Sequence, residues 1–291
     1  MEGRNRNRVS SVLPKPKKDP NQASVYPGLL SVIIPMYHEE KTIGKLIGTL
    51  VPLVRGGAEI LFCDGGSSDR TLEILNQMLP ELSACGHEAW KKRTAEGRKN
   101  KVAEGRKNKV PPQIQVFTSS QKGRAWQMNE AADRSHGSVL FFLHCDSEVP
   151  GDAAEEIARV LKHFSAGCFG IDFREKKNFF MYTCKWISNH RVKDRRVMFG
   201  DQGIFLRREL FYRIGAYPEL PIMEDYQLSL NLKAAGIRFG MTKHRIYTSP
   251  RRFQGNTFRK LHVMWQMNRL RAAYRRGVPI EEIAAKYRDI R

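Results

Sequence analysis

The chain has 291 residues, 41% of them hydrophobic, and a formal net charge of +20. A chain of this size and composition can bury a substantial core, so we expect one main globular domain. No apolar run approaches the roughly 18 residues of a membrane-spanning helix, and no signal-peptide pattern begins the chain. We therefore expect a cytoplasmic protein, peripheral to a membrane at most, with organelle targeting as a weak alternative.

The positive charge is concentrated in residues 1–19, 91–109 and 243–276, and the rest of the chain is close to neutral. These segments are separable from the body, and residues 91–109 lack the interleaved aromatic side chains that single-stranded nucleic-acid binding favours. A nucleic-acid-binding protein is therefore the less favoured interpretation of the charge. The five cysteines are odd in number and lack Cys-x-x-Cys spacing, which predicts buried, reduced thiols.

Two basic segments are expected to lie outside the folded core. Residues 1–28 are polar and lack periodicity, which predicts a disordered tail ahead of a domain over residues 29–291. An insertion at about residues 84–112 contains a tandem duplication, because residues 95–102 recur unchanged as residues 103–110. Two copies of so polar a unit cannot build a core, so the insertion is predicted to be a surface loop.

Strands and helices alternate along the body of the chain. Residues 30–35, 59–64, 114–119 and 139–144 have the apolar, β-branched character of strands, and helix patterns follow the first three. This alternation predicts an α/β fold with a mainly parallel central sheet and helices on both faces. Glu39, Asp64 and Asp146 follow three of the strands, at the sheet edge where α/β proteins bind ligands. A nucleotide site, a metal site or both are expected there.

The segment Asp64-Gly65-Gly66-Ser67-Ser68-Asp69 joins the second strand to its helix. Paired glycines let a ligand approach the main chain closely, and Ser68 is predicted to cap the helix. The pattern alone also suits an ordinary strand-to-helix turn.

Several motifs in chain order resemble family 2 glycosyltransferases of the GT-A fold, a Rossmann-like fold. They are residues 31–40 (SVIIPMYHEE), 64–71 (DGGSSDRT), 123–129 (GRAWQMN), 144–147 (HCDS), 199–205 (FGDQGIF), 221–225 (PIMED) and 249–253 (SPRRF). The later motifs are similar to the small subgroup called radical-SAM/selenodomain-associated transferases. The resemblance runs from about Leu30 to the C-terminus and is interrupted only by the insertion.

The resemblance implies a nucleotide-sugar donor site. Asp64 would accept a hydrogen bond from the base, and the loop after the first strand would line the base and ribose. Cationic forks would hold the diphosphate. The residues implied to bind the donor are Pro35, Tyr37, Glu39, Asp64, Arg124, Gln202, Arg251 and Arg252, with Gln202 in a loop whose simpler interpretation is a β-turn.

The resemblance also implies a divalent metal ion, Mn²⁺ or Mg²⁺, bound by Asp146. His144 occupies a position where the family usually has aspartate. Imidazole can ligate Mn²⁺ but weakens the case for Mg²⁺. His244 is an outside candidate for a further ligand, although a lone histidine is more often structural.

Asp225 is the implied general base, and Glu224 is its neighbouring competitor. Both lie at the start of a predicted helix, where carboxylates also interact favourably with the helix dipole by about 0.3–1 kcal/mol. The function implied is inverting hexosyl transfer, with UDP as the expected nucleotide. The alternatives are a catalytically silent relative, a sugar-phosphate nucleotidyltransferase and a nucleic-acid-binding protein.

The third basic segment contains one helix face formed by Val263, Met267, Leu270 and Tyr274. It is expected either to pack on the body or to rest on an anionic membrane that bears a lipid-linked acceptor.

Overall fold

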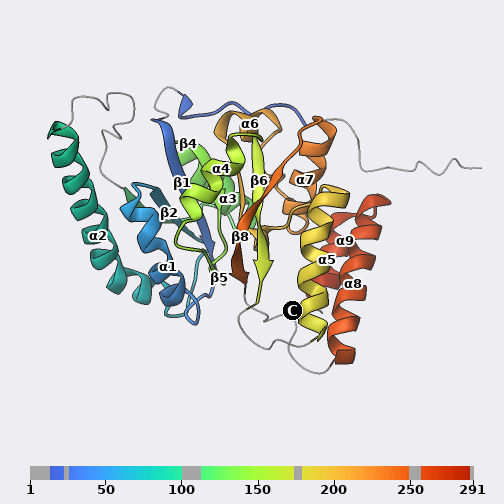
Figure 1. The fold of residues 1–291 in the computed structure, drawn as a ribbon. Helices are drawn as coiled ribbons and strands as arrows, with labels where there is room; N and C mark the ends of the chain where they lie inside the picture. The colour runs from blue at the N-terminus through green and yellow to red at the C-terminus, as the bar shows by residue number, and fades with distance from the viewer. Residues whose placement is uncertain (1–13, 23–25, 100–112, 174–178, 249–256, 289–291) are drawn as a thin grey trace, which may run out of the picture.

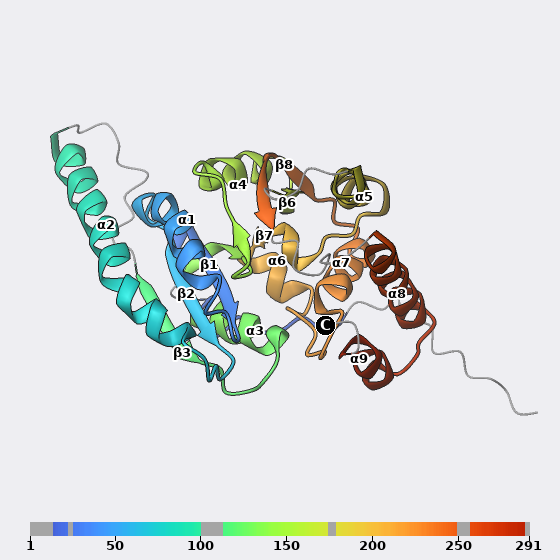
Figure 2. The same ribbon diagram turned by 90° about the horizontal axis from the view of Figure 1, so that it is seen from below.

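The computed structural model describes residues 14–22, 26–99, 113–173, 179–248 and 257–288. Its centre is a sheet with the strand order β3-β2-β1-β4-β7-β6-β8-β5 (Figures 1 and 2). The strands are β1 (Tyr26–Met36), β2 (Glu59–Asp64), β3 (Ile114–Thr118), β4 (Gly137–Phe142), β5 (Ser147–Glu148), β6 (Ala166–Asp172), β7 (Ile204–Arg207) and β8 (Gly240–Thr248).

The sheet is mainly parallel, as predicted. β1 pairs in parallel with β2 and β4, β2 with β3, and β6 with β8, whereas β7 is antiparallel to β4 and β6 and β5 is antiparallel to β8. The central strands are continuous apolar runs because helices cover both of their faces. β1 starts at Tyr26, four residues before the predicted strand.

The helices lie on both faces of the sheet (Figure 2). One core cluster joins the sheet to α1 (Ile43–Arg55), α2 (Thr71–Lys99) and α4 (Ala153–Leu161). The cluster on the other face includes α3 (Arg124–Arg134), α6 (Arg208–Arg213) and α7 (Glu224–Ala234). α5 (Phe179–Arg195), α8 (Thr257–Arg275) and α9 (Ile280–Arg288) stand together at the β8 side of the molecule (Figure 1).

The C-terminal helix α8 packs on the body through the face that the sequence singled out. Val263 is 9% exposed and Leu270 is 6% exposed, and Leu270, Met267 and Tyr274 belong to a third cluster with α7 and α9. The alternative of body packing is therefore correct for this face, which is not available to a membrane.

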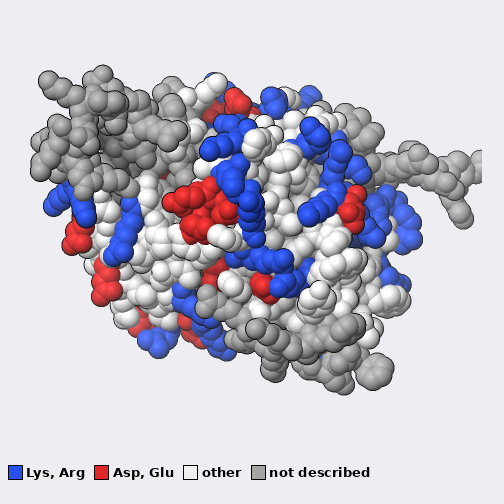
Figure 3. All heavy atoms as spheres, viewed as in Figure 1, with Lys and Arg blue, Asp and Glu red and all other residues white. Residues whose placement is uncertain are grey.

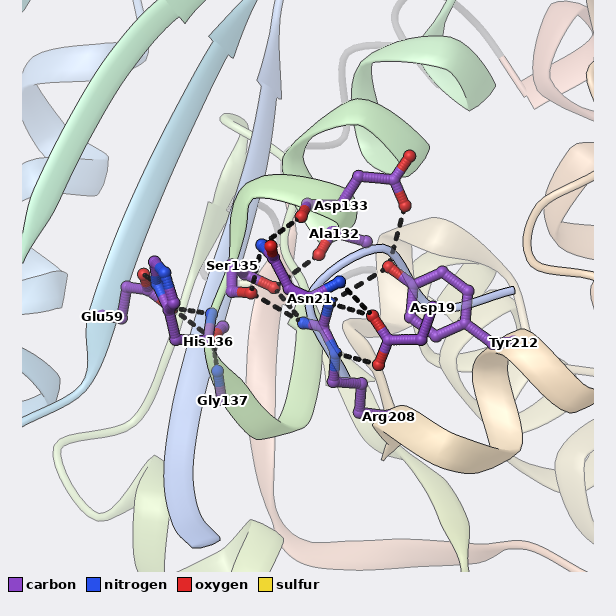
Figure 4. Close-up of polar contacts among 11 residues, drawn as sticks. Asp19, Asn21, Glu59, Ala132, Asp133, Ser135, His136, Gly137, Arg208 and Tyr212 are labelled. Atoms are coloured by element: carbon purple, nitrogen blue, oxygen red, sulfur yellow. Dashed lines mark hydrogen bonds and ion pairs between the residues drawn. The ribbon is translucent and has the colours of Figure 1, made fainter. Parts of the chain in front are cut away.

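The described part of the predicted tail is bound to the body, which corrects the expectation of disorder for residues 14–22 (Figure 4). Asp19 accepts two hydrogen bonds of 2.7 Å from Arg208, a residue of α6 that is only 2% exposed. Asn21 donates to the main-chain oxygen of Asp133, and Lys17 N–H donates to the oxygen of Tyr212 at 2.9 Å. The buried arginine needs this counter-ion, so the polar segment is fixed even though it has no periodicity.

The predicted loop at residues 84–112 is also partly wrong. α2 continues to Lys99 through the first residues of the duplication, while residues 100–112 lie outside the described part. The five cysteines are free thiols, as expected, and four are buried. Burial raises the pKa of Cys63 to about 12. In the described residues, no helix combines the length and apolar character needed to cross a bilayer.

Candidate active site at the strand ends

The carboxyl ends of β1 and β2 are fastened together by one glutamine. Gln127 Nε2 donates to the main-chain oxygens of Met36 at 2.7 Å and Cys63 at 2.8 Å. Gly65 lies against this amide, because a Cβ at position 65 would be 2.9 Å from Nε2. Gly66 has a φ of +87°, which favours glycine. The paired glycines therefore serve close packing and a left-handed turn.

Asp64 is 1% exposed, and its carboxylate organises its own loop. Oδ2 accepts hydrogen bonds of 2.9 Å from the N–H groups of Gly66 and Ser67, and Oδ1 accepts one of 2.6 Å from Ser67 Oγ. A nucleobase would have to share Oδ1 with that hydroxyl. The predicted cap is wrong, since Asp69 Oδ1, and not Ser68, accepts the Thr71 N–H at the start of α2.

The loop after β1 carries the other residues predicted to line the base pocket. Pro35 is buried at the end of the strand, whereas Tyr37 is 48% exposed and stacks on His38 with 4.0 Å between ring centroids. Glu39 is half-buried, and its carboxylate accepts a hydrogen bond from Thr42 Oγ1 at 2.5 Å. His38 N–H donates to Ser67 Oγ at 3.0 Å, which joins this loop to the loop of Asp64.

An open polar hollow of about 480 Å³ lies between the same two loops. His38, Glu40, Lys41, Ser68 and Asp69 line it. Its lining is charged and hydroxylic, which suits a polar ligand more than an apolar one.

Arg124 and Glu224 form an ion pair, which the sequence did not predict. The two side chains approach to 2.5 Å, and Glu224 is 2% exposed. Burial opposes the charge of Arg124, but attraction from Glu224 and Asp225 outweighs it and raises the pKa of Arg124 above its ordinary value. Burial raises the pKa of Glu224, and Arg124 opposes that rise. The ion pair removes Glu224 from contact with solvent, and the predicted contact of Arg124 with the donor stays a prediction.

Gly200 brings together the predicted metal segment and the predicted base. It begins the 3-10 turn η2 (Gly200–Gln202), and its N–H donates to Asp225 Oδ2 at 2.8 Å. The His144 ring packs on the same glycine, because a Cβ at position 200 would lie 2.5 Å from Nε2. Asp225 Oδ1 accepts the N–H of Tyr226 at 2.6 Å. His144 and Asp225, 81 residues apart in sequence, therefore meet at one small residue.

His144 and Asp146 follow β4, and both are half-buried. The Cys145 thiol between them donates to the main-chain oxygen of Pro35 at 3.6 Å, which holds the segment against the end of β1. An imidazole nitrogen and a carboxylate oxygen are ligands that suit Mn²⁺. The chemistry of these two donors suits such an ion, and their joint binding of a metal stays a prediction.

His244 does not join that pair. Among the described residues, the group of three possible ligands within 4.8 Å is Asp152, Glu156 and His244. Figure 3 shows acidic side chains gathered beside Lys and Arg near the centre of one face. Glu156 is saturated, since it accepts two hydrogen bonds from Arg159 and two from main-chain N–H groups of β8. This acidic cluster joins α4 to β8.

Gln202 is fully buried, and its Oε1 accepts the N–H of Phe199 at 3.1 Å. It closes the η2 turn, and its predicted contact with the donor stays a prediction. Arg251 and Arg252 lie outside the described residues.

Two functional candidates escaped the sequence analysis. The guanidinium carbons of Arg191 and Arg271 lie 4.0 and 5.2 Å from the ring centroid of Phe199, the residue before Gly200. The absence of acids from the third basic segment was the only sequence signal for Arg271, and Arg191 had none.

Comparisons with known proteins support the fold. The pattern of glycosyl transferase family 2 matches residues 31–93 and 99–215. Residues 1–349 of TarS from S. aureus align with a TM-score of 0.52 and 17% identity, over 90% of this chain and 71% of that one. The mannosyltransferase PcManGT from Pyrobaculum calidifontis, in complex with GDP-Man and Mn²⁺, aligns with a TM-score of 0.54 and 15% identity, over 90% and 66%. No match was found among curated proteins.

Proposed function

Because the chain belongs to glycosyl transferase family 2, whose GT-A fold it shares, we propose that it is an inverting glycosyltransferase that uses UDP-sugar and a divalent metal ion. The observation that carries the proposal is the meeting of His144 and Asp225 at Gly200. A donor held at the metal segment and an acceptor held at the base would then face each other across one small residue. The domain assigned to this activity is residues 29–291.

The donor side is built from the strand ends. The loops of Glu39 and Asp64 would hold the base and ribose, and Asp146 with His144 would hold the metal ion. When bound, that ion neutralises charge on the leaving diphosphate. TarS residues 1–349 have been solved with UDP-GlcNAc, with a TM-score of 0.52 and 16% identity over 90% of this chain and 72% of that one. We extend only the nucleotide to this chain, as part of the proposal.

Asp225 would act as the general base. Its two oxygens are oriented by the N–H groups of Gly200 and Tyr226, and each oxygen keeps a second lone pair. The acceptor hydroxyl oxygen would bond to the anomeric carbon as the bond from that carbon to the diphosphate breaks. The hydroxyl proton passes to Asp225, and the electron pair leaves with the diphosphate. Arg124 engages Glu224, which supports Asp225 as the carboxylate that receives the proton.

We further propose that the acceptor is lipid-linked and that α5 and α8 contact an anionic membrane on its cytoplasmic side. Five of the seven large apolar side chains that are exposed in the described residues lie on these helices: Tyr182, Trp186, Ile187, Leu261 and Trp265. α8 contains no Asp or Glu. Exposed aromatic rings beside cations suit the interface of an anionic bilayer.

A thermal-shift panel tests donor binding. UDP-, GDP- and dTDP-sugars are compared with and without Mn²⁺, because a ligand that binds the native state at 100 times its Kd stabilises it by about 2.7 kcal/mol. We expect the largest shift for UDP-sugar with Mn²⁺, and Asp146→Ala should lose the metal-dependent part. Equal shifts for every nucleotide, unchanged by metal, would contradict the proposal. A shift without sugar transfer would favour the silent-relative alternative.

A further inference from the structure

The side chain of Phe199 gathers two cations beside the proposed base. Arg191 comes from α5 and Arg271 from α8, and their guanidinium carbons lie 4.0 and 5.2 Å from its ring centroid. Phe199 immediately precedes Gly200, whose N–H binds Asp225. The charge of Asp225 attracts both cations, so the two guanidinium groups lie near the proposed base.

Neither cation has an ion pair with a carboxylate of the described residues. Arg271 donates to the Asn268 amide oxygen at 2.6 Å. The buried Nε of Arg191 has no hydrogen-bond partner among the described residues. Burial lowers the pKa of Arg191 to about 10, and the neighbouring Arg271 adds to this effect although Asp201 opposes it. Burial also lowers the pKa of Arg271. These guanidinium groups have lost water without gaining a close counter-ion.

An anionic ligand would relieve that cost. Guanidinium groups bind phosphate and carboxylate through paired N–H donors, and such charge-assisted bonds are strongest where water is excluded. Phe199 restricts both side chains, so little further ordering is needed when a ligand binds. Two restricted guanidinium groups at one ring therefore suit an anionic group.

The location of Arg191 and Arg271 indicates which ligand they would bind, the acceptor or the donor diphosphate. The donor diphosphate belongs with the metal segment, on the His144 side of Gly200. The arginines are gathered at Phe199 and are attracted by Asp225, where the acceptor hydroxyl must approach. We propose that Arg191 and Arg271 form a subsite for an anionic phosphate or carboxylate group of the acceptor, which positions its hydroxyl beside Asp225. This inference rests on the proposed role of Asp225.

Titration calorimetry with inorganic phosphate tests the subsite. The protein is first saturated with the nucleotide that gives the largest thermal shift, so that the donor site is filled. We expect phosphate binding to weaken at least about tenfold in Arg191→Gln and in Arg271→Gln, while nucleotide affinity changes less than about twofold. Arg269→Gln is the matched control. Arg269 lies on α8, as Arg271 does, and its guanidinium carbon is 4.5 Å from the ring centroid of Trp265.

Equal phosphate affinity in wild type and both glutamine variants would overturn the subsite, and so would an equal loss in Arg269→Gln. Phosphate that competes with the nucleotide would place the anion on the donor side and overturn it as well. If Arg191→Gln does not fold, Arg191→Lys replaces it and is expected to weaken binding because the fork is lost. If no nucleotide binds the wild type, the proposed function fails, whereas phosphate titration of the nucleotide-free protein still tests the subsite.

A vesicle arm identifies the source of the anion. Wild type and the two glutamine variants are compared for co-sedimentation with phosphatidic acid vesicles. Loss of vesicle binding together with phosphate binding assigns the subsite to a lipid headgroup. Unchanged vesicle binding with lost phosphate binding assigns it to a free anionic acceptor.

Discussion

Arg208 and Arg191 are both removed from much of their water, but their surroundings differ. Arg208 donates to both oxygens of Asp19 at 2.7 Å, to Ser135 at 2.8 and 2.9 Å, and to the Tyr212 hydroxyl at 3.3 Å (Figure 4). Burial opposes its charge, but Asp19, Tyr212 and Asp133 together outweigh that effect and raise the pKa of Arg208. For Arg191 burial prevails, and its pKa falls to about 10.

The contrast separates a structural arginine from a ligand-binding arginine. A buried cation with a complete set of partners fixes the chain segments that supply those partners. A partly desolvated cation without a close counter-ion adds little to stability and is instead suited to a ligand. The first environment lies beneath the N-terminal segment, and the second lies beside Asp225.

If Arg191 and Arg271 lie beside a reaction centre, Asp225→Asn should have the largest effect on sugar transfer of the variants considered. Asparagine has nearly the same size but cannot accept the acceptor proton, so sugar transfer should fall about 10²–10⁴-fold. Donor affinity should stay near that of wild type. Turnover and donor affinity are measured together.

Glu224→Gln is the matched control. It removes the ion pair with Arg124 and should cost stability, while folded molecules keep most of their turnover. Near-normal turnover in Asp225→Asn, or a loss confined to Glu224→Gln, would assign the base to the other carboxylate.

Arg208→Gln should produce the largest loss of stability. It leaves the Asp19 carboxylate, 11% exposed, without its cation, which should cost about 3–5 kcal/mol in the free energy of unfolding. Arg191→Gln loses the contact with Phe199 but no ion pair, and it should change that free energy by about 1 kcal/mol or less. Urea unfolding compares the two, and similar losses would abolish the distinction between the two environments.

Glu156, at the contact of α4 with β8, is another charged side chain with a complete set of partners. Its contribution to stability should depend on pH. Hydrogen bonds from Arg159 lower its pKa from 4.5 to about 2. Because the folded-state pKa is depressed, its contribution is complete above pH 4.5 and is lost as the pH falls toward 2. Glu156→Gln should therefore cost about 1.5–3 kcal/mol near pH 7 and almost nothing near pH 2. The same difference in free energy of unfolding between wild type and Glu156→Gln at pH 7 and pH 2 would contradict this role of Glu156.

Trp186→Ala and Trp265→Ala should have the smallest effects. Each side chain is 52% exposed, so each should contribute about 1 kcal/mol, or roughly fivefold, to partitioning onto phosphatidylglycerol vesicles. Tyr26→Ala is the control, because Tyr26 is 41% exposed at the start of β1. Equal binding by all three variants and the wild type would exclude α5 and α8 as the membrane contact.

The sequence predicted the elements more fully than the site. Apolar runs and glycine turns are local signals, so the parallel strands and the position of Asp64 at a strand end followed directly. The pairing of Arg124 with Glu224 joins residues 100 positions apart, and no local pattern encodes it. The same limit concealed the binding of Asp19 to Arg208, because a polar segment held by one buried charge looks like a disordered tail.

The most direct test is the free energy of unfolding of wild type, Asp19→Asn and Arg191→Gln, each with and without inorganic phosphate at matched ionic strength. Phosphate that binds the native state raises this free energy by linkage. We predict that Asp19→Asn is less stable than wild type but keeps the full phosphate-dependent increase. Arg191→Gln should keep wild-type stability and lose that increase. The reverse pattern, or the same phosphate response in all three proteins, would contradict the distinction between structural and ligand-binding arginines.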